Sequence, residues 1–313
     1  MIPYVVIFVI LVGLEALYIY VARRAGIVDV PTDRSSHRRP VVRGGGVVIY
    51  LGALAWWFVS GFTAPFAMIG LTLLAGVSFA DDLREVSVPV RLVMQFIGVG
   101  FILAECLPVG ASVLLWAVAL IIGVGLVNAF NFMDGINGLA GLYSFLLFGV
   151  LSYIDVFVVQ DFIDLRLLVI STLASGVFCL FNFRINAMCF AGDVGSIIIG
   201  GLALYALGSL VFYTGDIWWF GLVAVYGVDV VLTLCRRLAA GQNIFRAHRM
   251  HAYQLMSNEL HTPQLVVATA LCFLQAAIDV PLVFMDCVTA AYSGTVVAVL
   301  SVLYFTILAI SRK

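Results

Sequence analysis

The sequence predicts an all-α polytopic membrane protein, and three observations support this fold class. Of the 313 residues, 64% are hydrophobic and only 11% are charged, and the mean hydropathy is +1.15. A soluble protein of this size could not cover so much apolar surface with so few charges. Long apolar runs and short polar segments also alternate along the chain, and the charges gather in every second polar segment. We therefore expect one integral-membrane domain over residues 1–313.

Apolar runs of about 20 residues, the length that crosses a bilayer, define the transmembrane elements. We expect eleven spans, with ten as the alternative count, near residues 3–22, 45–62, 64–80, 90–105, 112–130, 139–158, 167–183, 195–213, 217–234, 264–284 and 293–310. The first run has Arg23 and Arg24 directly behind it and no basic residue ahead of it. This order is opposite to that of a cleavable secretory signal, so we expect the run to remain as an anchor.

The basic residues predict the orientation of these spans. Fifteen of the 16 lysine and arginine residues fall on one face, and Arg166 alone falls on the other. The positive-inside rule makes the basic face cytoplasmic, with the C-terminus on that side and the N-terminus periplasmic. This face comprises the loops near residues 23–44, 81–89, 131–138, 184–194 and 235–263. The six cysteines have no paired spacing, so neither a disulfide framework nor a cysteine metal site is indicated.

Two adjacent carboxylates, Asp81 and Asp82, end the third span in SFADDLREV. The last turn of a helix carries partial negative charge, so this pair needs a compensating cation and indicates a functional site. A solvated pair beside Arg84 is an equally good interpretation. Arg91 lies near the start of the fourth span. It either returns to the same site, where a lipid phosphate would be a natural partner, or extends to the membrane interface.

Four polar residues recur at every third position in NAFNFMDGING, namely Asn128, Asn131, Asp134 and Asn137. Steps of three keep side chains close on a helix surface, and polar groups at membrane depth are costly unless they line a cavity. We therefore expect a polar ridge that faces away from lipid, with two glycines that let the backbone open around a ligand. The alternative is an ordinary amide-bonded contact between helices.

The segment FAGDVGS places Asp193 between two glycines at the start of the eighth span. A carboxylate is electrostatically favourable near a helix N-terminus, so simple capping is one interpretation. Asp193 also belongs to an oxygen-rich, cysteine-free set with Asp81, Asp82, Asp134 and Asn131. Such a set suits Mg²⁺, or alternatively Mn²⁺, which bind through carboxylates and substrate phosphates.

The longest polar loop contains GQNIFRAHRMHAYQ, in which Arg246, His248, Arg249 and His251 form a cationic patch. Such a patch would bind phosphate groups, and arginine would do so bidentately. Zinc is a competing ligand for the two histidines, but their spacing of three residues is poor for a helical two-histidine motif. A loop of this kind also serves for orientation and contact with anionic lipid. Metal-holding acids and cations on one membrane face together predict phosphoryl transfer from a soluble diphosphate to a lipid phosphate.

Five segments carry a resemblance to a known family, in the order RSSHRRPVVRGGGVVI, FADDLREV, NAFNFMDGINGLAG, FAGDVGS and FRAHRMHAYQ. They resemble the polyprenyl-phosphate N-acetylhexosamine-1-phosphate transferases over nearly the whole chain, most closely the bacterial O-antigen initiating branch. The resemblance implies attack of undecaprenyl phosphate on the β-phosphorus of a UDP-N-acetylhexosamine, giving undecaprenyl-diphospho-sugar and UMP. The implied donors are UDP-N-acetylfucosamine (UDP-FucNAc), UDP-N-acetylquinovosamine (UDP-QuiNAc) and UDP-N-acetylglucosamine (UDP-GlcNAc). A phospho-N-acetylmuramoyl-pentapeptide transferase of peptidoglycan synthesis is the alternative.

The resemblance also implies roles for individual residues. Asp193 matches the metal aspartate, with Asn131 as a second ligand. Asp81 and Asp82 match an aspartate pair usually assigned to deprotonate or orient the lipid phosphate. Positioning explains this pair equally well, because a phosphate monoester is already largely ionised at pH 7. The catalytic set is completed by Asp134 and His251, and the substrate-binding residues are Arg43, Arg91, Asn128, Asn137, Asp229, His248 and Arg249.

Two positions depart from the family pattern. Gly227 stands where a proline is expected two residues before Asp229, and Asn137 stands where bacterial relatives commonly have Asp. The resemblance further implies membrane lipids as partners, no nucleic acid, a homodimer, and the bacterial inner membrane with the active site on its cytoplasmic face. A secondary transporter is the alternative from another class, but it would place ionisable residues near the bilayer midplane, often with inverted repeats. Neither feature is visible in the sequence.

Overall fold

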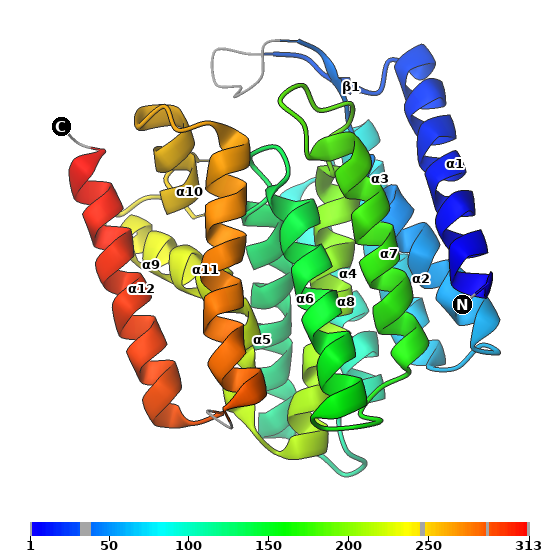
Figure 1. The fold of residues 1–313 in the computed structure, drawn as a ribbon, viewed down its shortest axis with the longest axis vertical. Coiled ribbons are helices and arrows are strands. Elements are labelled where there is room, and N and C mark those ends of the chain that lie inside the picture. The colour runs from blue at the N-terminus through cyan, green and yellow to red at the C-terminus, as the bar shows by residue number, and fades with distance from the viewer. Residues whose placement is uncertain (1, 32–38, 245–247, 286–287, 312–313) are drawn as a thin grey trace.

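The computed structural model describes residues 2–31, 39–244, 248–285 and 288–311 (Figure 1). These residues form an all-α bundle with one two-stranded antiparallel ribbon, which confirms the predicted fold class. The elements are α1 (Ile2–Ala25), β1 (Val28–Asp29), β2 (Val41–Val42), α2 (Val47–Val59), α3 (Pro65–Leu83), α4 (Val88–Cys106), α5 (Val113–Phe132), α6 (Leu139–Phe157), α7 (Leu165–Asn182), α8 (Gly192–Thr214), η1 (Ile217–Val223), α9 (Ala224–Ala239), α10 (Ala252–Gln254), η2 (Leu255–Glu259), α11 (Gln264–Phe284) and α12 (Ala290–Ile310).

Ten helices of the described chain are long and apolar enough to cross a membrane, and one of them, Ile217–Ala239, combines η1 with α9. The span predicted at 45–62 corresponds to α2, which has only 13 residues and is about 20 Å long. α2 begins at Val47 because Gly45 and Gly46 donate their backbone N–H groups to Phe190 and Ala191 instead of continuing a helix. Figure 1 shows α1 and α12 at opposite sides of the bundle.

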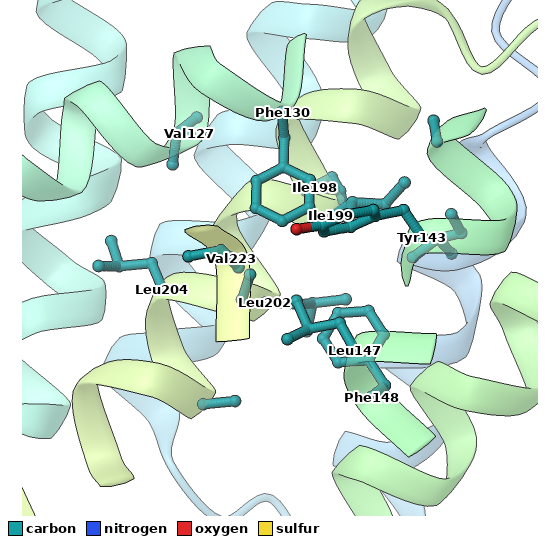
Figure 2. Packing of buried hydrophobic residues seen from close by; sticks show 14 of the residues in the cluster. Val127, Phe130, Tyr143, Leu147, Phe148, Ile198, Ile199, Leu202, Leu204 and Val223 are labelled. Atoms are coloured by element: carbon teal, nitrogen blue, oxygen red, sulfur yellow. The ribbon is translucent and has the colours of Figure 1, made fainter. Parts of the chain in front are cut away.

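Helix α8 lies at the centre of the bundle. Within its apolar window 89% of the residues are buried, against 22% in α1 and 17% in α12 at the periphery. Figure 2 shows Phe130 of α5 and Tyr143 of α6 beside Ile198 and Ile199 of α8. Gly200 allows this close packing, because a Cβ atom there would lie 2.8 Å from the Cα atom of Val127. The central helix therefore holds its first turn, with Asp193, in a fixed position.

The five polar segments that the sequence places on one face meet at one end of the bundle. Asp82 pairs with Arg43 at 2.9 Å, and Gly45 N–H donates to the Phe190 carbonyl at 2.8 Å. The hydroxyl of Tyr253 brings the fifth segment to the end of α5. These segments therefore lie on one side, as the alternation of charged and uncharged loops predicts. The assignment of this end to the cytoplasm stays a prediction.

Candidate active site

Asp82 connects the end of α3 to the beginning of α8. Its carboxylate accepts the backbone N–H groups of Asp193 and Val194, both at 2.9 Å, and lies 2.9 Å from Nε of Arg43. The Asp82 side chain is 0% exposed. Asp82 thus occupies the positive end of the α8 dipole. The interpretation of Asp193 as a simple cap is wrong, because Ala191 occupies the N-cap and the capping carboxylate comes from α3.

Asp81 has a different cation. Its Oδ2 atom lies 2.7 Å from Nη1 of Arg91, and its Oδ1 atom accepts the N–H of Val86 at 2.6 Å. The same Nη1 of Arg91 lies 3.2 Å from Oδ2 of Asp193. Arg91 therefore turns into the cluster rather than toward the membrane interface. The interpretation of a solvated aspartate pair beside Arg84 is also wrong, because both aspartates are buried and paired with other arginines.

The polar ridge of α5 divides between two different contacts. Asn131 donates from Nδ2 to Asp193 Oδ1 at 3.1 Å and to Ser196 Oγ at 3.0 Å. It therefore contacts the carboxylate cluster, which consists of Asp81, Asp82 and Asp193. Asn128, one turn earlier, donates to Gln95 Oε1 at 2.9 Å. For Asn128 the alternative interpretation of an amide-bonded helix contact therefore describes the structure.

The predicted ridge is wrong beyond Phe132, where α5 ends. Asn137 lies in the following turn and donates from Nδ2 to the carbonyls of Arg184 and Ile185 at 3.0 and 3.3 Å. Gly135 serves side-chain packing, because a Cβ atom there would collide with the Tyr253 hydroxyl, and Gly138 adopts a left-handed conformation with φ of +85°. The amide group of Asn137, which the resemblance implies binds substrate, thus ties two loops together.

Asp134 is a half-buried acid beside the carboxylate cluster. Burial and the negative charges of Asp193 and Asp82 raise the pKa of Asp134 to about 7. No hydrogen bond or ion pair joins its side chain to another residue in the described part of the chain. A bound cation would favour its charged form.

The donors in this region fit Mg²⁺ in chemistry although they are not preorganised for it. Within the described ranges, no three His, Cys, Asp or Glu side chains form a ready metal site. The available atoms are carboxylate and amide oxygens, which are the donors Mg²⁺ prefers, and they gather around Asp193. In this structure Arg91 and Asn131 engage the Asp193 carboxylate, so they would share it with a cation or yield it.

Asp229 of α9 binds the histidine loop, the segment 248–253 that carries His248 and His251. Its Oδ1 atom lies 3.1 Å from Nδ1 of His251 and accepts the N–H of Ala252 at 3.1 Å, and its Oδ2 atom accepts the N–H of Tyr253 at 3.4 Å. A carboxylate at Nδ1 favours the tautomer that is protonated there and leaves Nε2 unprotonated. The Nε2 atom is buried and has no partner among the described residues.

His248 lies next to His251, with ring centroids 4.9 Å apart. Burial, followed by the proximity of His251, lowers the pKa of His248 to about 4, so His248 is neutral at pH 7. Among the described residues of the predicted patch, the exposed Arg249 is charged, and His248 adds no charge at pH 7. Arg246, the other arginine of the predicted patch, lies outside the described residues.

Phe132 joins the two halves of the site. Its carbonyl accepts the Tyr253 hydroxyl at 2.8 Å, and its ring stacks on His251 at a centroid distance of 6.0 Å. The neighbouring residue in the chain is Asn131, which contacts Asp193. The carboxylate cluster and the histidine loop therefore border one region at this end of the bundle.

Several residues of this region were not predicted from the sequence. Gln95, Ser196, Phe132 and Tyr253 all contact predicted site residues. Gln95 is a polar residue in an apolar run, and Ser196 follows Asp193 by three positions, so both carried a signal. Phe132 and Tyr253 carried none, because aromatic residues are common throughout this chain.

The fold and the site define a class: a multi-pass membrane protein with buried acids, arginines and an Asp–His pair at one end of its bundle. Residues 64–211 match the model of glycosyl transferase family 4. This match and the similarity to polyprenyl-phosphate N-acetylglucosamine-1-phosphate transferases confirm the resemblance to polyprenyl-phosphate N-acetylhexosamine-1-phosphate transferases.

Three relatives illustrate the similarity. The chain is 28% identical to the undecaprenyl-phosphate alpha-N-acetylglucosaminyl 1-phosphate transferase of Thermotoga maritima, over 76% of each chain. It is 27% identical to the decaprenyl-phosphate N-acetylglucosaminephosphotransferase of Mycobacterium leprae, over 79% of this chain and 74% of the relative. It is 26% identical to the Escherichia coli K12 undecaprenyl-phosphate alpha-N-acetylglucosaminyl 1-phosphate transferase, over 75% and 70% of the two chains.

Proposed function

We propose that this protein transfers an N-acetylhexosamine-1-phosphate group from a UDP-sugar to undecaprenyl phosphate on the cytoplasmic face of the bacterial inner membrane. The observation that carries the proposal is the convergence of Asp81, Asp82 and Asp193 with Arg43 and Arg91 at one end of the bundle. The relatives act, by their names, on undecaprenyl or decaprenyl phosphate, which supports the acceptor.

Arg43 and Arg91 are the proposed ligands of the acceptor phosphate. Each is paired with a buried aspartate, and their side chains are 41% and 34% exposed. An incoming phosphate could therefore reach each guanidinium while the aspartate holds it in place, and guanidinium binds phosphate well. In this proposal Asp81 and Asp82 position arginines and helix α8, and they are not required to remove a proton.

Asp193 is the proposed metal ligand, with the Oδ1 atom of Asn131 as the second ligand and Asp134 beside it. Mg²⁺, or alternatively Mn²⁺, would neutralise the charge of the diphosphate in the reaction. Asn131 fixes the carboxylate of Asp193 at 3.1 Å, and Ser196 in turn accepts from Asn131. These residues hold the carboxylate in one orientation before any substrate binds.

The histidine loop is the proposed site for the donor diphosphate. His251 presents a buried Nε2 atom, and Arg249 adds a positive charge near Tyr253. In the reaction an oxygen of the acceptor phosphate bonds to the β-phosphorus of the donor. The bond from that phosphorus to the bridging oxygen breaks, and UMP leaves with that oxygen. In this scheme Asn128 and Asn137 act through helix and loop contacts, and Asp229 positions His251.

UDP-GlcNAc is the first donor to test, because the relatives are named for N-acetylglucosamine. UDP-FucNAc and UDP-QuiNAc, the donors of an O-antigen initiating enzyme, belong in the same panel with the UDP-muramoyl pentapeptide of peptidoglycan synthesis. A hydroxyl or methyl difference between sugars is worth about 1–3 kcal/mol in a binding site, so the panel decides among them. Initiation of lipopolysaccharide or a related envelope glycan, and a homodimeric state, also form part of this proposal.

The test uses the purified full chain in detergent with undecaprenyl phosphate, Mg²⁺ and each donor. UMP release is measured together with the mass of the lipid product. We expect release with at least one donor, dependent on both the lipid and the divalent cation. The Asp193→Asn variant should lose at least about 100-fold in rate, because even indirect support of a metal ligand is worth 10- to 100-fold.

Asp216→Asn is the matched control, since Asp216 lies at the opposite end of α8 and only caps η1. Its rate should equal that of the unmodified protein. Absence of release with every donor would overturn the proposed reaction, and full release from Asp193→Asn would overturn the role of this carboxylate.

A further inference from the structure

The candidate span Ile217–Ala239 changes its helix type along its length. Residues Ile217–Val223 form the 3₁₀-helix η1, and the α-helix α9 begins at Ala224. A change from one hydrogen-bonding pattern to another leaves backbone groups without partners, and water is absent at membrane depth to satisfy them. Val225 N–H and the Gly221 carbonyl flank this break.

Both groups bond to one side chain from α11. Gln275 accepts the N–H of Val225 through Oε1 at 3.0 Å, and its Nε2 donates to the Gly221 carbonyl at 2.9 Å. Gln275 is 1% exposed. The amide therefore gives the Val225 N–H an acceptor, and it gives the Gly221 carbonyl, which also accepts the Ala224 N–H, a second donor. An apolar residue could do neither.

The same amide has two further partners, so its hydrogen-bonding capacity is fully used. The Tyr143 hydroxyl of α6 donates to Oε1 at 2.7 Å, and Nε2 donates to Asp279 Oδ1 at 2.7 Å. The ring of Tyr143 stacks on Tyr226 of α9, with centroids 3.7 Å apart and planes inclined by 15°. Gln275 thus fixes the beginning of α9 directly and also through Tyr143.

Helix α9 carries this constraint to the active site. Asp229 lies one turn after Val225 and binds His251, Ala252 and Tyr253. Figure 1 shows α9 steeply inclined to α11, so a change at the break would move Asp229 relative to the rest of the bundle. The histidine loop would move with Asp229, because three donors of that loop share this one carboxylate.

We propose that Gln275 is a positioning residue, which sets the direction of α9 and thereby places Asp229 and the histidine loop against the carboxylate cluster. This inference rests on the proposed function for its kinetic consequence. The donor diphosphate meets the histidine loop, whereas the acceptor phosphate meets Arg43 and Arg91. A disturbed Gln275 should therefore weaken donor binding and leave acceptor binding unchanged.

The experiment compares Gln275→Leu, Gln275→Glu and Tyr143→Phe in the full-length protein. Leu removes all four bonds at similar volume, Glu retains an acceptor for Val225, and Tyr143→Phe removes one bond only. We expect the KM for the UDP-sugar to rise about 10-fold or more in Gln275→Leu, and less in the other two, while the KM for undecaprenyl phosphate stays within about twofold. Phe273→Leu is the control, because Phe273 lies on the same helix and is 72% exposed.

Hydrogen–deuterium exchange gives a readout that does not depend on activity. Gln275→Leu should increase exchange at the amides of Ala252 and Tyr253 and leave exchange in α3 and α8 unchanged. Equal changes in both KM values, or an increase in exchange spread over the whole bundle, would show a general structural role and overturn the inference. If Gln275→Leu does not fold, the same criteria apply to Gln275→Glu and Tyr143→Phe. Absence of activity in the unmodified protein would contradict the proposed function alone, and the exchange result would still decide the inference.

Discussion

The carboxylate of Asp82 accepts the backbone N–H of Asp193 at 2.9 Å, so a residue at the end of α3 caps the helix that carries the proposed metal ligand. The Asp82 carboxylate combines two interactions, that of an anion at a helix N-terminus and an ion pair with the partly exposed Arg43. Helices α3 and α8 are thereby fixed relative to each other at the point where the acceptor phosphate and the metal are proposed to meet.

Asp82→Ala should lower both stability and activity. The change removes the cap of α8, worth about 1 kcal/mol. It also removes the partner of Arg43, and because the Arg43 side chain is 41% exposed this loss adds only about 0–1 kcal/mol. We expect a lower apparent Tm in detergent and a loss of at least about 100-fold in UMP release. Asp82→Asn, which keeps one acceptor oxygen, should have the higher Tm of the two variants. A normal rate in Asp82→Ala would contradict the role of this carboxylate.

Gly195→Ala tests the packing of the glycine-rich segments against each other. A Cβ atom on Gly195 would lie 2.6 Å from the Cα atom of Gly46, so backbone would have to move. Overpacking of this kind costs about 1–3 kcal/mol, and we expect a reduced apparent Tm. Gly13→Ala is the control, because no atom lies within 4 Å of a Cβ there and alanine favours a helix. Equal Tm values in the two variants would show that the segments separate easily.

Asp134→Asn should change the pH dependence of stability. The pKa of Asp134 in the folded protein is raised from the ordinary 3.8 to about 7. The raised pKa means that folding stabilises the protonated carboxyl group. This stabilisation is complete below the pKa of Asp134 in the unfolded chain, and it is lost as the pH rises through the pKa in the folded protein. The variant should therefore gain apparent Tm relative to the unmodified protein between about pH 4 and about pH 8. A constant difference across this range would place Asp134 in a solvated environment.

Asp229→Ala should damage the histidine loop specifically. The change leaves His251 Nδ1 and the N–H groups of Ala252 and Tyr253 without their acceptor. Each buried unpaired donor costs about 1–3 kcal/mol. We expect the KM for the UDP-sugar to rise by about 10-fold or more. In a double-mutant cycle with His251→Ala the two losses should be less than additive, because Asp229 acts through His251, and full additivity would separate their roles.

The sequence was sufficient for the fold class because apolar length and charge distribution are local properties of the chain. It also identified Asp81, Asp82, Asp193 and Arg91 as candidates, since scarce charges in an apolar chain are informative. It offered Arg91 as a partner for Asp81 and Asp82 only beside the alternative of the membrane interface, and it did not pair Arg43 with Asp82. Arg43 pairs with Asp82 across 39 positions and Arg91 meets Asp193 across 102, and such distances are closed only by the packing of helices.

The polar ridge shows where a periodic pattern stops being informative. Residues Asn128, Asn131, Asp134 and Asn137 follow one period, but α5 ends at Phe132. The period therefore describes a helix face for the first two residues only. The end of the helix depends on Gly135 and on the Tyr253 hydroxyl that packs there from a distant loop, which the local pattern does not contain.

The sequence by itself determined that this chain is a helical membrane protein with its charges concentrated on one face, because bilayer thickness and charge placement act on each segment separately. The tertiary structure alone decided which charges meet. In the tertiary structure Asp82 caps α8, Arg91 contacts Asp81 and Asp193, and Asp229 binds the histidine loop. The physical reason is that burial leaves each carboxylate dependent on donors from other elements, and only the packing around α8 brings those donors within reach.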